Sequence, residues 1–406
     1  IYSRKKEGVL PFLHEREDIH MRKFYTAEAV TEGHPDKLCD QIADAILDVC
    51  LKNDENSRVA CEVLATKGNI IVAGEITSAY EPDVFAVVRK VLSDVGYSSE
   101  GVTMDTFVHR QSPDIAEAVN ASKERRGGVS DNQIDWFQGA GDQGVMIGYA
   151  CDETKQLMPM PVVLANRIVR ELSACRQSSY IQGILPDGKA QVTVEYENGK
   201  PVRLDSVVVS CQHKEEKDLK KLEAEIRKKV LLPALRPLPP DEETKIYINP
   251  SGRFVCGGLD ADTGLTGRKL MVDSYRSMVP HGGGAFAGKD CSKVDRSAAY
   301  MARYIAKNIV AAGLASKCQV SLAYAIGVAQ PVMVQVDTFG TGNVCADDCL
   351  ELAIPLVFGL TPKQIVDTLR LTRPIFRQTA AFGHFGRKEF PWEHTDKAEA
   401  LRNAVI

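Results

Sequence analysis

The chain of 406 residues has 44% hydrophobic and 26% charged side chains, which is typical of a folded globular protein large enough for more than one domain. Its net charge of −4 provides no basic surface, so we expect no nucleic-acid partner. No apolar run reaches membrane-spanning length and no secretory leader opens the chain, which predicts a cytosolic protein without a membrane partner.

The first twenty residues lack the periodicity of a helix or a strand. We expect residues 1–20 to be a leader that is non-native or disordered, with Met21 as the natural start. A first unit follows, in which a helix precedes two strands and a second helix. Its expected elements are helix 37–51, strands 59–64 and 70–76, and helix 83–95.

The same order of elements occurs twice more along the chain. The second unit is expected to contain helix 161–175, strands 191–196 and 202–210, and helix 217–231. The third is expected to contain helix 297–312, strands 319–327 and 332–337, and helix 361–371. The spacing of about 130 residues is too long for a solenoid. We therefore predict an α+β fold of three pseudo-symmetric repeat domains, each a mostly antiparallel, hairpin-built sheet with helices on one face.

Two irregular stretches separate these units. Residues 233–240 include four prolines and predict a linker between the second unit and the third. Residues 112–138 have little apolar content and predict a mobile lid. The expected domains are an N-terminal domain (21–121), a mobile active-site loop (122–135), a central domain (136–247) and a C-terminal domain (248–406).

The eleven cysteines are scattered singly through these units. Cys345 and Cys349 are the closest pair, and no two cysteines stand in a C-x-x-C motif. This pattern indicates reduced thiols rather than a disulfide framework or a zinc site.

A glycine-rich polar motif precedes the first helix of each unit. The three motifs span residues 33–37, 139–144 and 282–290. Three such motifs at equivalent places favour one composite site where the units meet.

The third motif lies in the segment 281–296, which is rich in groups that bind anions. Glycines there let backbone N–H groups approach phosphate oxygens, and Lys289 and Lys293 add positive charge. A P-loop is disfavoured, because Asp290 stands where a P-loop has Ser or Thr and the preceding residues are too polar for a buried strand. A plain surface turn would explain the glycines but not the lysines and aspartates.

With these motifs the chain resembles the S-adenosylmethionine synthetases (methionine adenosyltransferases) from about Phe24 to Asn403. The matching motifs are Glu32-Gly-His-Pro-Asp-Lys37, Gly139-Ala-Gly-Asp-Gln-Gly144, Gly264-Leu-Thr-Gly-Arg-Lys269, Gly282-Gly-Gly-Ala-Phe-Ala-Gly-Lys-Asp290 and Gly383-His-Phe-Gly-Arg387. The resemblance implies attack of the methionine sulfur on C5′ of ATP, followed by hydrolysis of the tripolyphosphate to diphosphate and phosphate. It also implies homodimers with active sites at the interface, commonly paired as homotetramers.

The resemblance also implies roles for particular residues. The catalytic residues would be His34, Lys189, Arg268 and Lys289, and the ATP site would add Asp187, Arg253, Phe254, Asp262, Lys269 and Ala285. The methionine site would consist of Glu75, Gln111, Asp142, Asp262 and Lys293. Two Mg²⁺ per site would involve Asp36 and Asp295, and one K⁺ per subunit would involve Glu62. Taken singly, His34 is equally suited to capping a helix, the aspartates likewise, and Phe254 to packing in the core.

Two departures from the family pattern and two rival functions stay open. Ala287 replaces a usual serine, and the 112–138 segment is longer than in common members. A catalytically silent regulatory subunit would be expected to lack some of the charged residues, and a P-loop ATPase would produce ADP.

Overall fold

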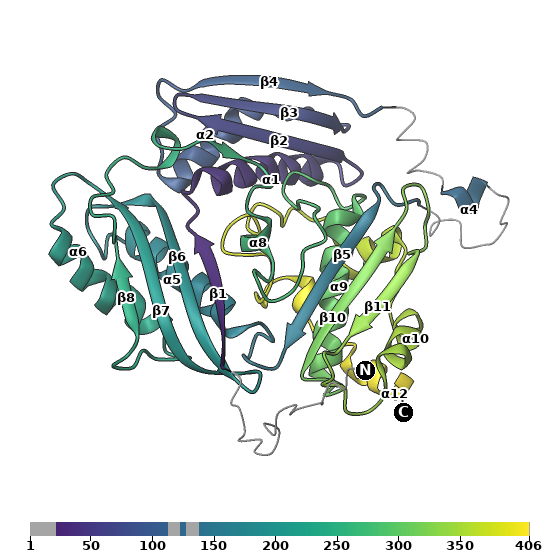
Figure 1. Ribbon diagram of the computed structural model, residues 1–406. Coiled ribbons are helices and arrows are strands. Elements are labelled where there is room, and N and C mark those ends of the chain that lie inside the picture. The colour runs from purple at the N-terminus through teal and green to yellow at the C-terminus, as the bar shows by residue number, and fades with distance from the viewer. Residues whose placement is uncertain (1–21, 113–121, 127–137, 406) are drawn as a thin grey trace, which may run out of the picture.

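The computed structural model describes residues 22–112, 122–126 and 138–405. The leader 1–20 and most of the expected loop 122–135 lie outside the described residues, apart from the short helix α4 (Lys123–Arg126). Three sheets lie around a common centre (Figure 1). The predicted α+β fold with three repeated units is confirmed.

The first sheet is built on the predicted hairpin of β2 (Arg58–Thr66) and β3 (Asn69–Thr77). Gly68 in its turn has φ 71°, a left-handed conformation that glycine adopts without strain. β4 (Thr103–His109) joins β3 in parallel and β9 (Gly264–Leu265) joins β2 in antiparallel fashion. The helices α1 (Pro35–Asn53) and α2 (Val84–Val95) confirm the two predicted helices, and α1 packs on β2.

The second sheet has the order β1-β6-β7-β8. Its strands are β1 (Arg22–Val30), β6 (Ile184–Glu197), β7 (Lys200–His213) and β8 (Lys245–Ile248), and α5 (Met160–Gln177) covers it. The predicted helix 217–231 is only partly right. It consists of α6 (Leu219–Ile226) and a π-helical turn (Arg227–Leu231), followed by α7 (Leu232–Ala234). The wide turn stands just before Pro233, which has no backbone N–H for a regular helix.

The third sheet has the order β11-β10-β5. It consists of β5 (Gly144–Cys151), β10 (Lys317–Tyr324) and β11 (Met333–Asp337), with α9 (Val294–Ala311) buried against it. The predicted final helix appears as α11 (Pro362–Leu369), whereas α10 (Asp347–Val357) and α12 (Ala398–Val405) were not predicted. Short helical turns complete the unit: Gly258–Asp260, α8 (Leu270–Asp273) and Pro391–Glu393.

The sheets are interlocked along the chain. β1 precedes the first hairpin but pairs with β6, and β5 precedes the second hairpin but pairs with β10. β9 returns from the third stretch to β2. The buried apolar side chains accordingly form one continuous cluster through all three units.

Candidate functional site

The first predicted motif forms the N-terminus of α1. His34 is the N-cap residue, and its Nδ1 accepts the backbone N–H of Asp36 at 3.2 Å. The Asp36 carboxylate accepts the backbone N–H of Leu265 at 3.0 Å and pairs with the Lys269 ammonium at 2.5 Å. The Arg268 guanidinium lies 3.8 Å from the same carboxylate. The first and fourth predicted motifs therefore meet at Asp36.

The charges of this group are set by burial and by one another. Burial, followed by the nearby Lys269 charge, lowers the pKa of His34 to about 4, although Asp36 opposes the shift. Burial would raise the pKa of Asp36, but hydrogen bonds from Lys269 and from Leu265 outweigh it and lower that pKa. At neutral pH the site therefore holds a neutral imidazole beside an ionised carboxylate and cations.

The segment 281–296 lies against β2, as a loop and not as a P-loop. Residues 270–282 form α8 and turns rather than a strand. Asp290 exchanges backbone contacts with Val59, whose N–H also donates to the Asp290 carboxylate at 2.7 Å. Gly288 has φ 76°, and a Cβ there would lie 1.9 Å from the Cys61 carbonyl oxygen. Only glycine fits this close approach.

The two predicted phosphate-side lysines of this segment each have an acidic partner. Lys289 pairs with Asp295 and Lys293 with Asp290, both at 2.5 Å. Gly284 packs so closely on Asp295 that a Cβ there would lie 2.3 Å from the carboxylate carbon. Ala285 contacts the other loop, because a Cβ built on Gly267 would lie 2.8 Å from the Ala285 methyl carbon. Ala287 is 3% exposed, so its side chain is covered by the protein.

A row of aspartates on α1, which the sequence analysis missed, holds both loops. Asp40 accepts the backbone N–H of Gly267 at 3.0 Å, and Asp44 accepts that of Gly288 at 2.8 Å. Asp44 also forms a fully buried ion pair with Arg296. The four-residue spacing of Asp36, Asp40 and Asp44 along a predicted helix was the available signal.

The predicted nucleoside residues lie on β6 and on the turns beside it. Asp187 is buried and accepts the Gly258 N–H at 2.9 Å, and burial raises its pKa. Lys189 pairs with Glu28, and both Lys189 and Asp262 are close enough to His34 to affect its pKa. Arg253 pairs with Glu215 at 3.0 Å, and Phe254 is half-buried.

The other predicted residues lie apart from this group. Glu75 pairs with His109 at 3.1 Å, the backbone N–H of Gln111 donates to Thr77, and Asp142 accepts the N–H of Gln143. Glu62 is exposed and accepts a hydrogen bond from Thr266. None of these contacts within the described ranges reaches the His34 group, so one chain does not assemble the whole predicted site.

The carboxylates suit metals that also take phosphate oxygens. In the described part of the chain no cluster of three His, Cys, Asp or Glu side chains is arranged to hold a metal ion. Asp36 and Asp295 are each single carboxylates beside a lysine. Mg²⁺ that arrives with a polyphosphate needs only one or two protein carboxylates, so this donor set fits it.

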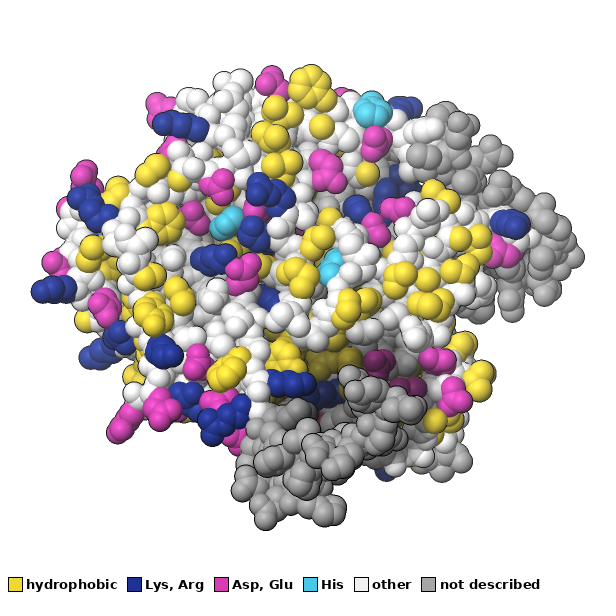
Figure 2. All heavy atoms as spheres, viewed as in Figure 1, with side chains coloured by type: hydrophobic (Ala, Val, Ile, Leu, Met, Phe, Trp, Pro, Cys, Tyr) yellow, Lys and Arg dark blue, Asp and Glu magenta, His cyan; other side chains and the backbone are white. Residues whose placement is uncertain are grey.

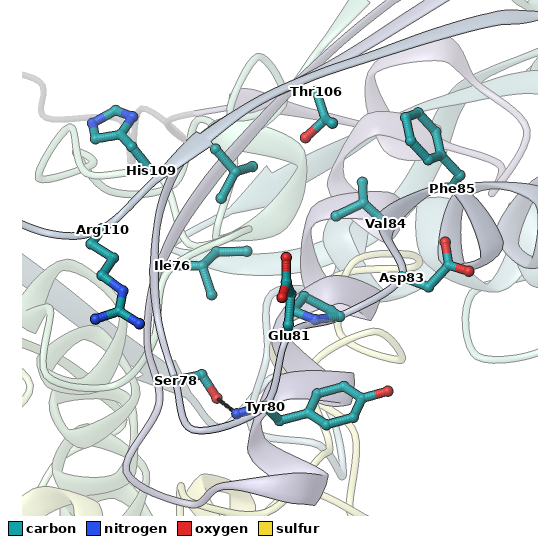
Figure 3. A pocket seen from close by; sticks show the side chains of 12 residues that line it. Ile76, Ser78, Tyr80, Glu81, Asp83, Val84, Phe85, Thr106, His109 and Arg110 are labelled. Carbon is teal, nitrogen blue, oxygen red and sulfur yellow. Dashed lines mark hydrogen bonds between the residues drawn. The ribbon is translucent and has the colours of Figure 1, made fainter.

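A pocket of about 480 Å³ beside β3 and β4 lies outside the predicted site. Figure 3 shows that His109 and Arg110 line it from the end of β4, and Glu81 and Asp83 from the loop before α2. It contains no predicted site residue. By contrast, Figure 2 shows basic, acidic and histidine side chains gathered near the centre where the three sheets meet.

Family comparison covers most of the chain with three models. The N-terminal domain of S-adenosylmethionine synthetase matches residues 22–119, the central domain 137–254 and the C-terminal domain 256–394. The chain belongs to the S-adenosylmethionine synthetase family. This membership supports S-adenosylmethionine synthesis from ATP and methionine as the general function, a transferase reaction in a family that uses Mg²⁺ and K⁺.

The helices give a separate result on membranes. Among the described residues no single helix is long and apolar enough to cross a bilayer. The pair α10 and α11 passes by length and composition together, but it is bent by 76°.

Proposed function

We propose that the chain transfers the adenosyl group of ATP to methionine by attack of the sulfur on C5′, and then hydrolyses the bound tripolyphosphate to diphosphate and phosphate. The observation that carries this proposal is the neutral His34 within a group of cations. A thioether sulfur has no proton to lose, so the reaction needs stabilisation of a departing polyphosphate rather than a general base.

His34 has the right tautomer for that task. Its Nδ1 accepts the Asp36 N–H, so the neutral ring carries its proton on Nε2. Nε2–H is then a donor for the oxygen that leaves C5′. Lys189, Arg268, Lys269 and Lys289 neutralise the three phosphates.

The metal and methionine assignments are part of the same proposal. Asp36 and Asp295 would hold Mg²⁺, two ions per site, which supply positive charge to the polyphosphate. Glu62 and its neighbour Thr266 offer hard oxygen ligands for K⁺. Asp187, Arg253, Phe254, Asp262 and Ala285 would bind the nucleoside. Glu75, Gln111, Asp142, Asp262 and Lys293 would bind methionine.

Two features of the chain bear on its assembly and its compartment. The methionine residues Glu75 and Gln111 lie apart from the His34 group in one chain, which supports a homodimer with active sites at the interface and, from it, a homotetramer. All eleven cysteines are free thiols, which supports a reducing compartment such as the cytosol.

An ATP analogue with nitrogen in place of the β,γ bridging oxygen tests the two steps. The bond broken in the first step joins C5′ to its oxygen, so S-adenosylmethionine should form at a rate comparable to that with ATP. The imido-triphosphate should resist hydrolysis and stay bound among the cations. We expect one product per active site in a quenched-flow experiment, followed by arrest.

Other outcomes would contradict the proposal in different ways. No product would exclude attack at C5′, and ADP from ordinary ATP would indicate a P-loop type ATPase. Continued turnover of the analogue would exclude a required hydrolysis step. No reaction with either nucleotide would support a silent regulatory subunit.

A further inference from the structure

Few of the cysteines can be reached by a reagent in the folded chain. Eight of the eleven are buried, Cys256 is exposed, and Cys345 and Cys349 are partly exposed. The proposed reaction uses none of the last three. Cys256 stands alone, whereas Cys345 and Cys349 are neighbours in space as well as in sequence.

The start of α10 brings these two thiols together. Ala346 is the N-cap residue of the helix, Cys345 precedes it, and Cys349 lies in the first turn, where its N–H bonds to the Ala346 carbonyl at 3.1 Å. A spacing of four residues on a helical turn places side chains on one side. The thiols are hydrogen-bonded to each other.

The surrounding contacts keep this turn in place. Asp347 accepts the backbone N–H of Thr338 at 3.1 Å and its hydroxyl at 2.6 Å, which attaches the start of α10 to the end of β11. Leu350, one residue after Cys349, is fully buried. A disulfide requires two nearby Cβ atoms and little backbone movement, and a held turn with touching thiols meets this condition.

We propose that Cys345 and Cys349 form a dithiol modification site, which a small disulfide such as oxidised glutathione converts into an intramolecular disulfide. One protein thiolate attacks the reagent, its S–S bond breaks, and one reagent thiol leaves. The second protein thiolate then attacks the first protein sulfur and displaces the other reagent thiol. Two protein S–H bonds and one reagent S–S bond become one protein S–S bond and two reagent S–H bonds, so the protein is oxidised and the reagent reduced.

The rate of this exchange depends on the thiolate fraction. Burial, and after it the hydrogen bond with Cys349, raises the pKa of Cys345 to about 11. Cys345 is therefore the poorer first nucleophile. The reagent has to be supplied in excess and for long enough.

The experiment uses the folded full chain and oxidised glutathione. The exposed Cys256 has no thiol neighbour, so it can only retain a mixed disulfide, and the incubation is continued until Cys256 carries glutathione completely. Remaining thiols are then alkylated and the chain is cleaved before aspartates. Cleavage at Asp347 and Asp348 separates Cys345 from Cys349, so mass spectrometry detects their disulfide as two joined peptides.

We expect the joined peptides in most molecules, with no glutathione on either cysteine. In Cys349→Ser, Cys345 has no partner to displace the reagent and should retain glutathione. In Cys256→Ser, the joined peptides should form as in the wild type. Free Cys345 and Cys349 beside fully modified Cys256, or a separate glutathione on each, would overturn the proposal.

Discussion

The imidazole of His34 is held neutral by its position. Only 16% of its side chain is exposed, and Lys269 and Lys189 both oppose a positive charge on it. The folded pKa of about 4 lies below the ordinary value of 6.5, so between these pH values the unfolded chain binds more protons than the folded one. The stabilisation is complete above pH 6.5 and is lost as the pH falls towards 4.

This shift predicts a measurable effect of His34→Asn. Asparagine still accepts the Asp36 N–H as an N-cap residue but does not titrate. Between pH 7 and pH 5 the wild type should lose about 2 kcal/mol more of its free energy of unfolding than the variant does. Urea unfolding of both proteins at the two pH values checks this. Equal losses would show that His34 titrates normally.

The carboxylate of Asp36 leads to a prediction about turnover. Asp36→Asn keeps an acceptor for the Leu265 N–H but removes the charge proposed to hold Mg²⁺. We expect product formation to fall by at least about 100-fold with the fold retained, and the same for Asp295→Asn. Asp83→Asn at the N-cap of α2 is the matched control, because asparagine caps equally well there. Near-normal activity in either site variant would refute the metal assignment.

At the scale of elements, α1 organises the site through its aspartates. Asp36, Asp40, Asp44 and Asp48 follow one another at intervals of four residues, and each accepts backbone N–H groups from a different part of the chain. Asp48 receives those of Phe376 and Arg377, both at 2.9 Å. The helix thereby fixes the loops that carry the candidate phosphate residues.

The energetic roles of these aspartates differ, because only some have a cationic partner. Asp44→Asn leaves the Arg296 charge fully buried and should cost about 3 kcal/mol of the free energy of unfolding. Asp48 has no ion pair, and burial raises its pKa to about 6, so Asp48→Asn should cost only about 1 kcal/mol for one lost hydrogen bond. Urea unfolding at pH 7 compares the two. A similar cost for both would mean that the ion pair with Arg296 is not the main contribution.

The sequence predicted local elements better than the contacts between distant ones. The helix α9 and the hairpins of β2 with β3 and of β6 with β7 follow from apolar periodicity and turn residues, which act over a few positions. β1, β5 and β9 pair with strands far away in sequence, and no local pattern specifies such partners. Likewise, the motif residues His34, Asp36 and Lys269 were predicted together, whereas Asp44 was missed because its partners Gly288 and Arg296 are known only from the fold.

At the scale of the molecule, one chain separates two groups of predicted catalytic residues. His34, Asp36, Arg268 and Lys269 form one group, and Lys289 pairs with Asp295 in another. An active site at a homodimer interface would combine the first group of one chain with the second group of its partner. A site within one chain would use both groups of the same chain.

Mixed dimers distinguish these two arrangements. Arg268→Ala and Lys289→Ala each remove a proposed phosphate-binding cation, and the Arg268 side chain is half exposed, so its loss should not affect folding. Two chains carrying different tags and one substitution each are coexpressed, and the heterodimer is purified through both tags. If sites combine two chains, one of its two sites has both Arg268 and Lys289, so we expect about half of the wild-type activity per dimer. A second heterodimer pairs a doubly substituted chain with a wild-type chain. There each interfacial site lacks one of the two cations, so we expect almost no activity. Sites within single chains require the reverse, with an inactive first heterodimer and a half-active second one. That result, or failure to recover any heterodimer, would contradict the proposed interface.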